Sequence, residues 1–184
     1  RQTDRQTDRQ TDRRLVSILV PCYNEEAVLH QFYARTSEVI AKIPSYDFEF
    51  VFVNDGSKDS TLDIMRELRE KDSRVSYVNL SRNFGKEIAM IAGIDYLQGD
   101  AAVIMDADLQ DPPELIPEMI SWWEKGYDDI SAKRRSRAGE SFFKKWSSHT
   151  FYRLLQHLTN IQIQPDVGDF RLLDKQCLNA MRLM

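Results

Sequence analysis

The chain has 184 residues, 42% of them hydrophobic, which suits a single domain with its own core. Its net charge is −4, from 25 basic and 29 acidic residues, and non-specific nucleic-acid binders are usually basic, so we expect no nucleic-acid partner. No run of about 18 apolar residues is present to span a bilayer, and no signal peptide is visible.

The first residues differ in kind from the rest of the chain. Residues 1–12 repeat Arg-Gln-Thr-Asp three times, and a repeat without apolar side chains has nothing to bury. We therefore predict a disordered, low-complexity tail over residues 1–14 and one folded domain over residues 15–184. Because the chain ends at Met184 inside a predicted helix, we expect the domain to be truncated at its C-terminus.

From Leu15 onwards, short apolar runs alternate with segments of helical periodicity. The apolar runs predict strands over Leu15–Val20, Phe48–Val53, Val75–Leu80, Ala101–Met105 and Asp128–Ala132. The segments between them predict helices over Glu25–Ile43, Ser60–Lys71, Lys86–Leu97 and Pro113–Lys125. Apolar strands separated by helices indicate an α/β fold, with a Rossmann-like, doubly wound, mostly parallel sheet sandwiched by helices.

Beyond residue 132 the pattern is less regular. The polar, glycine-containing segment Lys133–Glu140 predicts a loop, and Ser141–Leu158 has the periodicity of a strongly amphipathic helix. Such a helix either packs its aromatic face against the sheet or lies in a membrane interface, and both alternatives stay open.

Polar clusters follow three of the predicted strands. The first strand leads into 21–26, the second into 54–59 and the fourth into 106–111. Since open α/β sheets bind ligands at the carboxyl ends of their strands, we expect the clusters to line one rim. No Gly-x-Gly-x-x-Gly follows the first strand and no P-loop motif occurs, so a nucleotide there would not be held by a glycine-rich cradle.

Asp106 and Asp108 are the candidate metal ligands. In extended backbone, side chains two residues apart point to the same side, and a divalent cation would relieve the repulsion between their carboxylates. Mg²⁺ and Mn²⁺ prefer oxygen ligands, and Gln110 would add a carbonyl oxygen. The alternative is a solvated acidic loop that caps the next helix.

The other two clusters suit a nucleoside. Asp55 would accept a hydrogen bond from a base-ring N–H. The base and ribose would pack against, and form hydrogen bonds with, Pro21, Tyr23 and Glu25. The alternative is an ordinary loop, because Asn-Asp-Gly-Ser is also a glycine turn followed by a helix cap.

Four motifs occur together along the chain: Pro-Cys-Tyr-Asn-Glu-Glu, Asn-Asp-Gly-Ser-x-Asp-x-Thr, Ser-Arg-Asn-Phe-Gly-Lys-Glu and Asp-Ala-Asp-Leu-Gln-Asp-Pro-Pro-Glu. As a set they resemble the family 2 glycosyltransferases, whose catalytic domain has the GT-A fold. The resemblance covers about residues 15–184 and is strongest to the polyprenyl-phosphate branch, which includes dolichyl-phosphate mannose synthases and bactoprenol glucosyltransferases. It implies that residues 15–184 are a glycosyltransferase catalytic domain.

The resemblance implies a metal-dependent, inverting transfer of a hexose from a UDP-glucose or GDP-mannose type donor to a polyprenyl phosphate, with Mg²⁺ or Mn²⁺ as cofactor. Asp106, Asp108 and Gln110 would bind the metal. The residues implied to contact the nucleotide sugar are Pro21, Tyr23, Glu25, Val53, Asp55, Asp106, Ala107, Asp108 and Arg134. The residues implied in catalysis are Asp108, Arg134 and Asp169. Arg134 would contact phosphate, and Asp169 would lie near the acceptor.

Asp169 has more than one interpretation. A hydroxyl acceptor would need a base, and Asp169 is the candidate. A polyprenyl phosphate is already an anion, so Asp169 would then orient the acceptor or an arginine. A structural carboxylate paired with Arg171 is the third interpretation.

Several alternatives for the whole chain stay open. They are a family 2 transferase that acts on a glycan or polysaccharide hydroxyl, a nucleotidyltransferase, and a non-catalytic nucleotide-sugar binding module. For the polyprenyl-phosphate branch we expect a full-length protein anchored at the cytoplasmic face of a membrane, whose surface is then a partner. We expect the present piece to be soluble, and a homo-oligomer is an open alternative.

Overall fold

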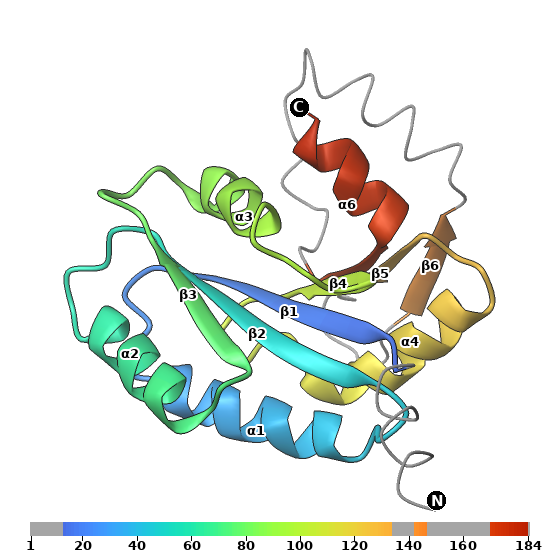
Figure 1. The fold of residues 1–184 in the computed structure, drawn as a ribbon, viewed down its shortest axis with the longest axis horizontal. Coiled ribbons are helices and arrows are strands. Elements are labelled where there is room, and N and C mark those ends of the chain that lie inside the picture. Colours follow the sequence, from blue (N-terminus) through green and yellow to red (C-terminus); the bar gives the residue numbers. More distant parts are fainter. Residues whose placement is uncertain (1–12, 134–141, 147–169, 184) are drawn as a thin grey trace, which may run out of the picture.

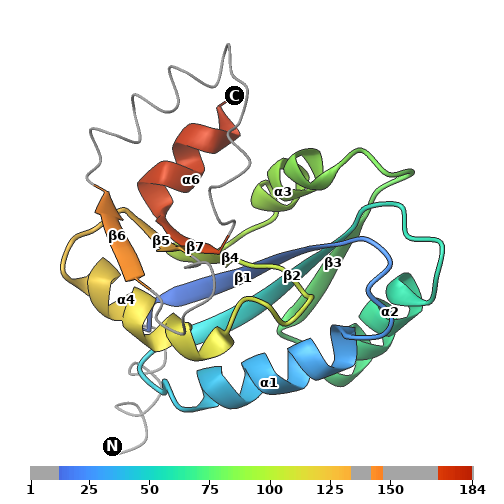
Figure 2. The same ribbon diagram turned by 180° about the vertical axis from the view of Figure 1, so that it is seen from behind.

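The computed structural model describes residues 13–133, 142–146 and 170–183, and it confirms the α/β class. Its centre is a seven-stranded sheet in the order β3-β2-β1-β4-β7-β5-β6 (Figures 1 and 2). The strands are β1 Leu15–Cys22, β2 Asp47–Asn54, β3 Val75–Asn79, β4 Ala101–Ile104, β5 Asp129–Lys133, β6 Phe142–Trp146 and β7 Arg171–Asp174. The helices are α1 Leu29–Ala41, α2 Thr61–Lys71, α3 Lys86–Ile94, α4 Ile116–Glu124 and α6 Lys175–Arg182, with a 3-10 turn, η1 Pro113–Leu115, directly before α4.

The sheet has a parallel half and a mixed half. β1 pairs in parallel with β2 and with β4, and β2 pairs in parallel with β3. β7 lies between β4 and β5 and is antiparallel to both, and β6 pairs antiparallel with β5 at the edge. The parallel half therefore confirms the strand-helix alternation predicted from the sequence.

The mixed half is where the sequence prediction is wrong. Ser141–Leu158 is predicted as one amphipathic helix, yet Phe142–Trp146 forms strand β6. Three of these five residues are aromatic, which favours a strand, and the edge of β5 offers backbone partners. β7 had no counterpart among the predicted strands. The remainder of the predicted helix, most of the predicted loop and the repeat of residues 1–12 lie outside the described residues.

Side chains alternate between two hydrophobic clusters on opposite faces of the sheet. Along β2, Phe50 and Phe52 belong to the cluster that α1, α2 and α4 cover, whereas Val51 belongs to the cluster that α3 and α6 cover. Figures 1 and 2 show the two sets of helices on opposite sides. Because both faces are covered, the central strands β1, β2 and β4 consist mostly of apolar residues. None of the helices in the described ranges has the length and hydropathy that crossing a membrane requires.

Asp72, which follows α2, ties this helix to α1 and β3. Its carboxylate accepts hydrogen bonds from Arg74 Nη2 at 2.7 Å and from the Tyr33 hydroxyl at 2.6 Å. These bonds lower the pKa of Asp72 from 3.8 to about 2. A carboxyl group whose pKa is lower in the folded than in the unfolded state stabilises the fold above pH 4, and this contribution is lost as the pH falls from about 4 to about 2.

Asp72→Asn should therefore destabilise the protein in a pH-dependent way. We expect the free energy of unfolding to fall by about 1–2 kcal/mol at pH 7 and by much less near pH 2, where the wild-type carboxyl is also protonated. Urea unfolding at both pH values measures this, with Asp63→Asn on the exposed face of α2 as the control. An equal loss at both pH values would contradict the assigned role of the charge.

Candidate active site

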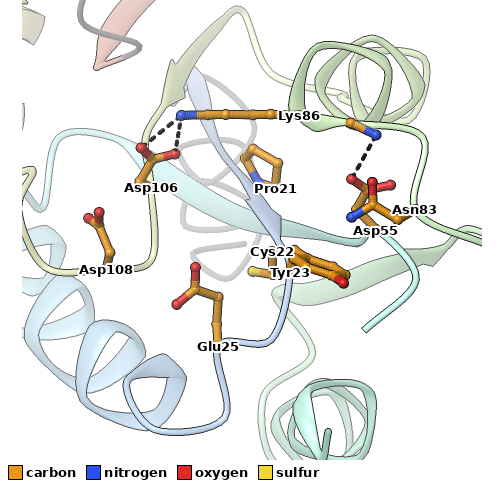
Figure 3. A pocket seen from close by; sticks show the side chains of 10 residues that line it. Pro21, Cys22, Tyr23, Glu25, Asp55, Asn83, Lys86, Asp106 and Asp108 are labelled. Atoms are coloured by element: carbon orange, nitrogen blue, oxygen red, sulfur yellow. Dashed lines mark hydrogen bonds and ion pairs between the residues drawn. The ribbon is translucent and has the colours of Figure 1, made fainter. Parts of the chain in front are cut away.

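A pocket of about 280 Å³ lies where β1, β2 and β4 end (Figure 3). The residues that line it are Pro21, Cys22, Tyr23, Glu25, Asp55, Asn83, Gly85, Lys86, Asp106 and Asp108. The three polar clusters do meet at one rim, as expected from their position after parallel strands.

The loops that follow β1 and β2 are hydrogen-bonded to each other. The Asn24 amide donates to Ser57 Oγ at 3.0 Å, and the Lys58 amide donates to Asn24 Oδ1 at 2.8 Å. Asn24 has a φ of 53°, a left-handed conformation that asparagine tolerates better than most residues. The Glu25 amide donates to Thr61 Oγ1 at 2.8 Å. This mutual support fixes the backbone that carries Glu25 and the half-exposed ring of Tyr23 at the pocket wall.

Asp55 organises a third loop, the one between β3 and α3. Its side chain is buried, and its two oxygens accept hydrogen bonds from the Phe84 amide at 2.8 Å and the Gly85 amide at 3.1 Å. The sequence assigns Asp55 to a base-ring N–H, and this role stays a prediction. The structure adds that Asp55 holds the loop against the pocket.

The loop after β4 is a tight turn. The Asp106 amide donates to Asp111 Oδ2 at 3.0 Å, and the Gln110 amide donates to Asp108 Oδ1 at 3.1 Å. Leu109 has a φ of 65°, a conformation that costs a non-glycine residue about 1 kcal/mol or more. The turn leaves Asp106 and Asp108 facing the pocket (Figure 3), whereas Gln110 is not among the residues that line it.

The pocket carries four carboxylates and one ammonium group among its lining residues. Lys86 Nζ lies 2.6 Å from Asp106 Oδ1 and 2.8 Å from its Oδ2. Burial raises the pKa of Asp106, contact with Lys86 lowers it, and the nearby carboxylates raise it again. Burial also raises the pKa of Glu25, and the charges of Asp108 and Asp106 add to this effect. Burial is the largest cause for both groups, and the neighbouring carboxylates add to it; their negative charge favours the binding of a cation.

Asp106 and Asp108 fit a divalent cation that brings ligands of its own. Within the described ranges, no three acidic, histidine or cysteine side chains are grouped closely enough to hold a metal. Mg²⁺ is commonly held by one or two carboxylates and completes its shell with phosphate oxygens and water. Two adjacent carboxylates on a pocket rim are that kind of donor set.

The pocket also holds a cysteine, which is not a candidate nucleophile. The Cys22 side chain is buried, and burial raises the pKa of its thiol well above 9.0. A thiol that stays protonated at neutral pH is a poor nucleophile and a poor metal ligand.

Besides Gln110, two described residues assigned by resemblance, Val53 and Ala107, are not among those that line the pocket. Val53 and Ala107 are buried in the two hydrophobic clusters, so any contact with a nucleoside would come from their backbone. Arg134 and Asp169 lie outside the described residues, and their roles stay predictions. Arg171 Nη1 lies 3.7 Å from Asp129 Oδ2, which gives this arginine a carboxylate partner besides the one suggested from sequence.

Three pocket residues were not assigned a position from the sequence: Asn83, Gly85 and Lys86. They follow β3, whose carboxyl end lies at the same rim as those of β1 and β2. Since β3 is parallel to β2, the position of these residues after a strand is the signal in the sequence that points to the same rim.

Comparisons with known proteins identify the family of this chain. The family described as "Glycosyl transferase family 2" matches residues 17–181. The uncharacterized glycosyltransferase YkcC of Bacillus subtilis is 52% identical over 166 residues, which are 90% of this chain and 51% of YkcC. A prophage bactoprenol glucosyl transferase homolog of Escherichia coli is 41% identical over 169 residues, 92% of this chain and 55% of the relative. The chain thus spans about half the length of these curated relatives.

Among the solved structures that share the fold is one that covers most of the chain. It is the mannosyltransferase PcManGT from Pyrobaculum calidifontis in complex with GDP-Man and Mn²⁺, with a TM-score of 0.65 at 22% identity. The likeness covers 92% of this chain and 47% of that one, and at this identity it concerns the fold alone.

Proposed function

This chain belongs to glycosyl transferase family 2, and we propose that it provides the donor site of an inverting, metal-dependent hexosyltransferase. The donor is a nucleoside-diphosphate sugar, and the acceptor is a polyprenyl phosphate at a membrane surface. The observation that carries the donor site is the pairing of Asp106 and Asp108 at the end of β4 in one pocket with Tyr23 and Asp55. The acceptor rests on the relative named as a bactoprenol glucosyl transferase homolog.

The side chains of the pocket suggest how the donor is held. The half-exposed ring of Tyr23 offers an apolar face to a base, and Glu25 on the same wall offers acceptor oxygens to ribose hydroxyls. Asp106 and Asp108 hold a divalent cation against the diphosphate. When bound, this cation neutralises the charge that develops on the leaving diphosphate.

The acceptor chemistry requires little from the protein. A polyprenyl phosphate is an anion at neutral pH, so direct attack on the anomeric carbon needs no proton removal. Asp169 would then orient the acceptor, and Arg134 would contact phosphate. Both lie beyond the described residues, so their roles rest on the motif resemblance. If the acceptor were a glycan hydroxyl instead, a base would be indispensable.

Nucleotide-dependent stabilisation tests the donor site directly. With Mn²⁺ present, the preferred diphosphate among UDP and GDP should raise the melting temperature by about 5–10 °C when its concentration is about 100-fold above Kd. Without Mn²⁺ the shift should be much smaller, because the carboxylates repel the diphosphate. A thermal-shift panel of both diphosphates, UDP-glucose, UDP-N-acetylglucosamine and GDP-mannose measures this. No shift with any of them would contradict the donor site.

The acceptor needs a separate experiment. The full-length protein, supplied with the donor that the panel selects, should glycosylate a polyprenyl phosphate and leave free sugars and glycans unmodified. Transfer to a glycan hydroxyl alone would replace the polyprenyl phosphate in the proposal. Donor hydrolysis without transfer to any acceptor would leave only a nucleotide-sugar binding module.

A further inference from the structure

Lys86 is the single basic side chain among the described residues that line the pocket, and it contacts a carboxylate assigned to the metal. We propose that Lys86 and the divalent cation exchange at Asp106: the ammonium neutralises Asp106 until the donor arrives, then moves to the diphosphate as the metal takes its place. The inference rests on the proposed donor site, and it assigns to Lys86 a role that none of the motifs specifies.

The Lys86 ammonium group and a divalent cation exclude each other at Asp106. Lys86 Nζ lies 2.6 and 2.8 Å from the two oxygens of Asp106, so it faces the carboxylate from the side on which a chelated ion would sit. Mg²⁺ lies about 2.0–2.1 Å from its oxygen ligands. A divalent ion on the same oxygens would therefore stand almost in contact with the ammonium, and like charges repel. Metal binding at Asp106 requires that the Lys86 head group leave.

The backbone of Lys86 is held in place, whereas its head group can change partners. Lys86 is the first residue of α3, and the preceding amides of Phe84 and Gly85 are bonded to the buried carboxylate of Asp55. The backbone before Lys86 is thus held by Asp55. The lysine side chain, by contrast, has a flexible four-carbon stem and is 41% exposed. Figure 3 shows this stem crossing the pocket above Pro21 towards Asp106.

A bound diphosphate is the group to which the displaced Lys86 ammonium can move. The remaining lining groups with charge are the carboxylates of Glu25, Asp55 and Asp108, and Asp55 is occupied by backbone amides. A diphosphate that enters with the metal brings several anionic oxygens within reach of the stem. Lysine binds phosphate as a point charge without strict geometry. The exchange therefore couples metal binding to nucleotide binding, because a bound diphosphate offers the displaced ammonium several anionic oxygens in place of the carboxylate that it leaves.

Titration of Mn²⁺ in the absence and presence of UDP or GDP, followed by the electron paramagnetic resonance signal of free Mn²⁺, tests the exchange. In Lys86→Met, Mn²⁺ alone should bind about tenfold more tightly, because its competitor is gone. In the same variant, UDP or GDP with Mn²⁺ should bind about tenfold more weakly, because the diphosphate has lost a cation. Lys86→Arg should retain the competition, because it keeps the charge.

Lys71→Met is the matched control, since it removes the same charge from an ion pair with Glu67 on α2. It should leave both affinities unchanged. Circular dichroism checks folding, and Lys86→Gln serves as a second uncharged variant if the methionine variant unfolds. Unchanged or weaker Mn²⁺ binding in the uncharged variant overturns the exchange, as does unchanged nucleotide binding. Asp108→Ala, measured in parallel, separates the two proposals: if it keeps Mn²⁺-dependent nucleotide binding, the donor site itself fails.

Discussion

Asp108→Ala is expected to abolish metal-dependent nucleotide binding and glycosyl transfer while leaving the fold intact. Asp108 lies on the pocket rim beside Asp106, and a divalent cation that completes its shell with phosphate oxygens and water has only these one or two carboxylates to hold it to the protein. The charge stabilisation that such an ion supplies is worth several kcal/mol, so nucleotide affinity and the transfer rate should each fall by about 100-fold or more. Calorimetry of UDP or GDP with Mn²⁺ against the variant measures the binding.

Stability should move in the opposite direction from activity in this variant. Burial raises the pKa of Asp106 and of Glu25, and the charge of Asp108 raises both further, because neighbouring carboxylates repel one another. Removing one of them should leave the melting temperature unchanged or slightly higher. Asp63→Ala, on the exposed face of α2, controls for the loss of a carboxylate elsewhere. Unchanged affinity for the nucleotide with Mn²⁺ in Asp108→Ala would refute the metal site.

The parallel half of the sheet could be predicted because its strands and helices are each specified by the hydrophobic pattern of a short stretch of sequence, and this pattern repeats. Each strand from β1 to β4 is a short apolar run, and each is followed by a segment of helical periodicity long enough to return the chain to the same edge. The site followed from the same rule, because carboxyl ends of parallel strands meet at one edge. Tyr23, Asp55 and Asp106 were placed correctly on the rim from their position after a strand.

The mixed half could not be predicted because its strands depend on distant partners. β7 lies between β4 and β5, and its strand-forming segment Arg171–Asp174 is only four residues long. Such a short segment has no periodicity to measure, and β6 takes its conformation from the edge of β5. The positive φ of Leu109 was also invisible, because leucine carries no sequence signal for a left-handed turn. Contacts between loops, such as those of Asp55 with the amides after β3, could not be predicted either, because no sequence signal marks them.

Gly56→Ala is expected to cause the largest structural loss at the site. Gly56 has a φ of 69°, and a Cβ there would come within 2.3 Å of the Asn83 amide nitrogen and 2.4 Å of the Arg82 carbonyl carbon. Both contacts are with backbone, so no side chain can rotate away. The loop after β3 would have to shift, together with Lys86 and the two amides that Asp55 holds. We expect a loss of several kcal/mol in the free energy of unfolding and a loss of nucleotide binding of more than tenfold.

Gly126→Ala separates the clash from the strain of the backbone conformation. Gly126 has a φ of 93°, but a Cβ there would meet nothing within 4 Å, and it is not among the residues that line the pocket. It should therefore cost about 1–2 kcal/mol and leave nucleotide binding unchanged. Chemical unfolding and calorimetry of both variants give the comparison. If Gly56→Ala cost no more than Gly126→Ala and bound the nucleotide normally, the loop after β3 would not be held by its contact with Gly56. The position of Lys86 would then depend on Asp55 alone.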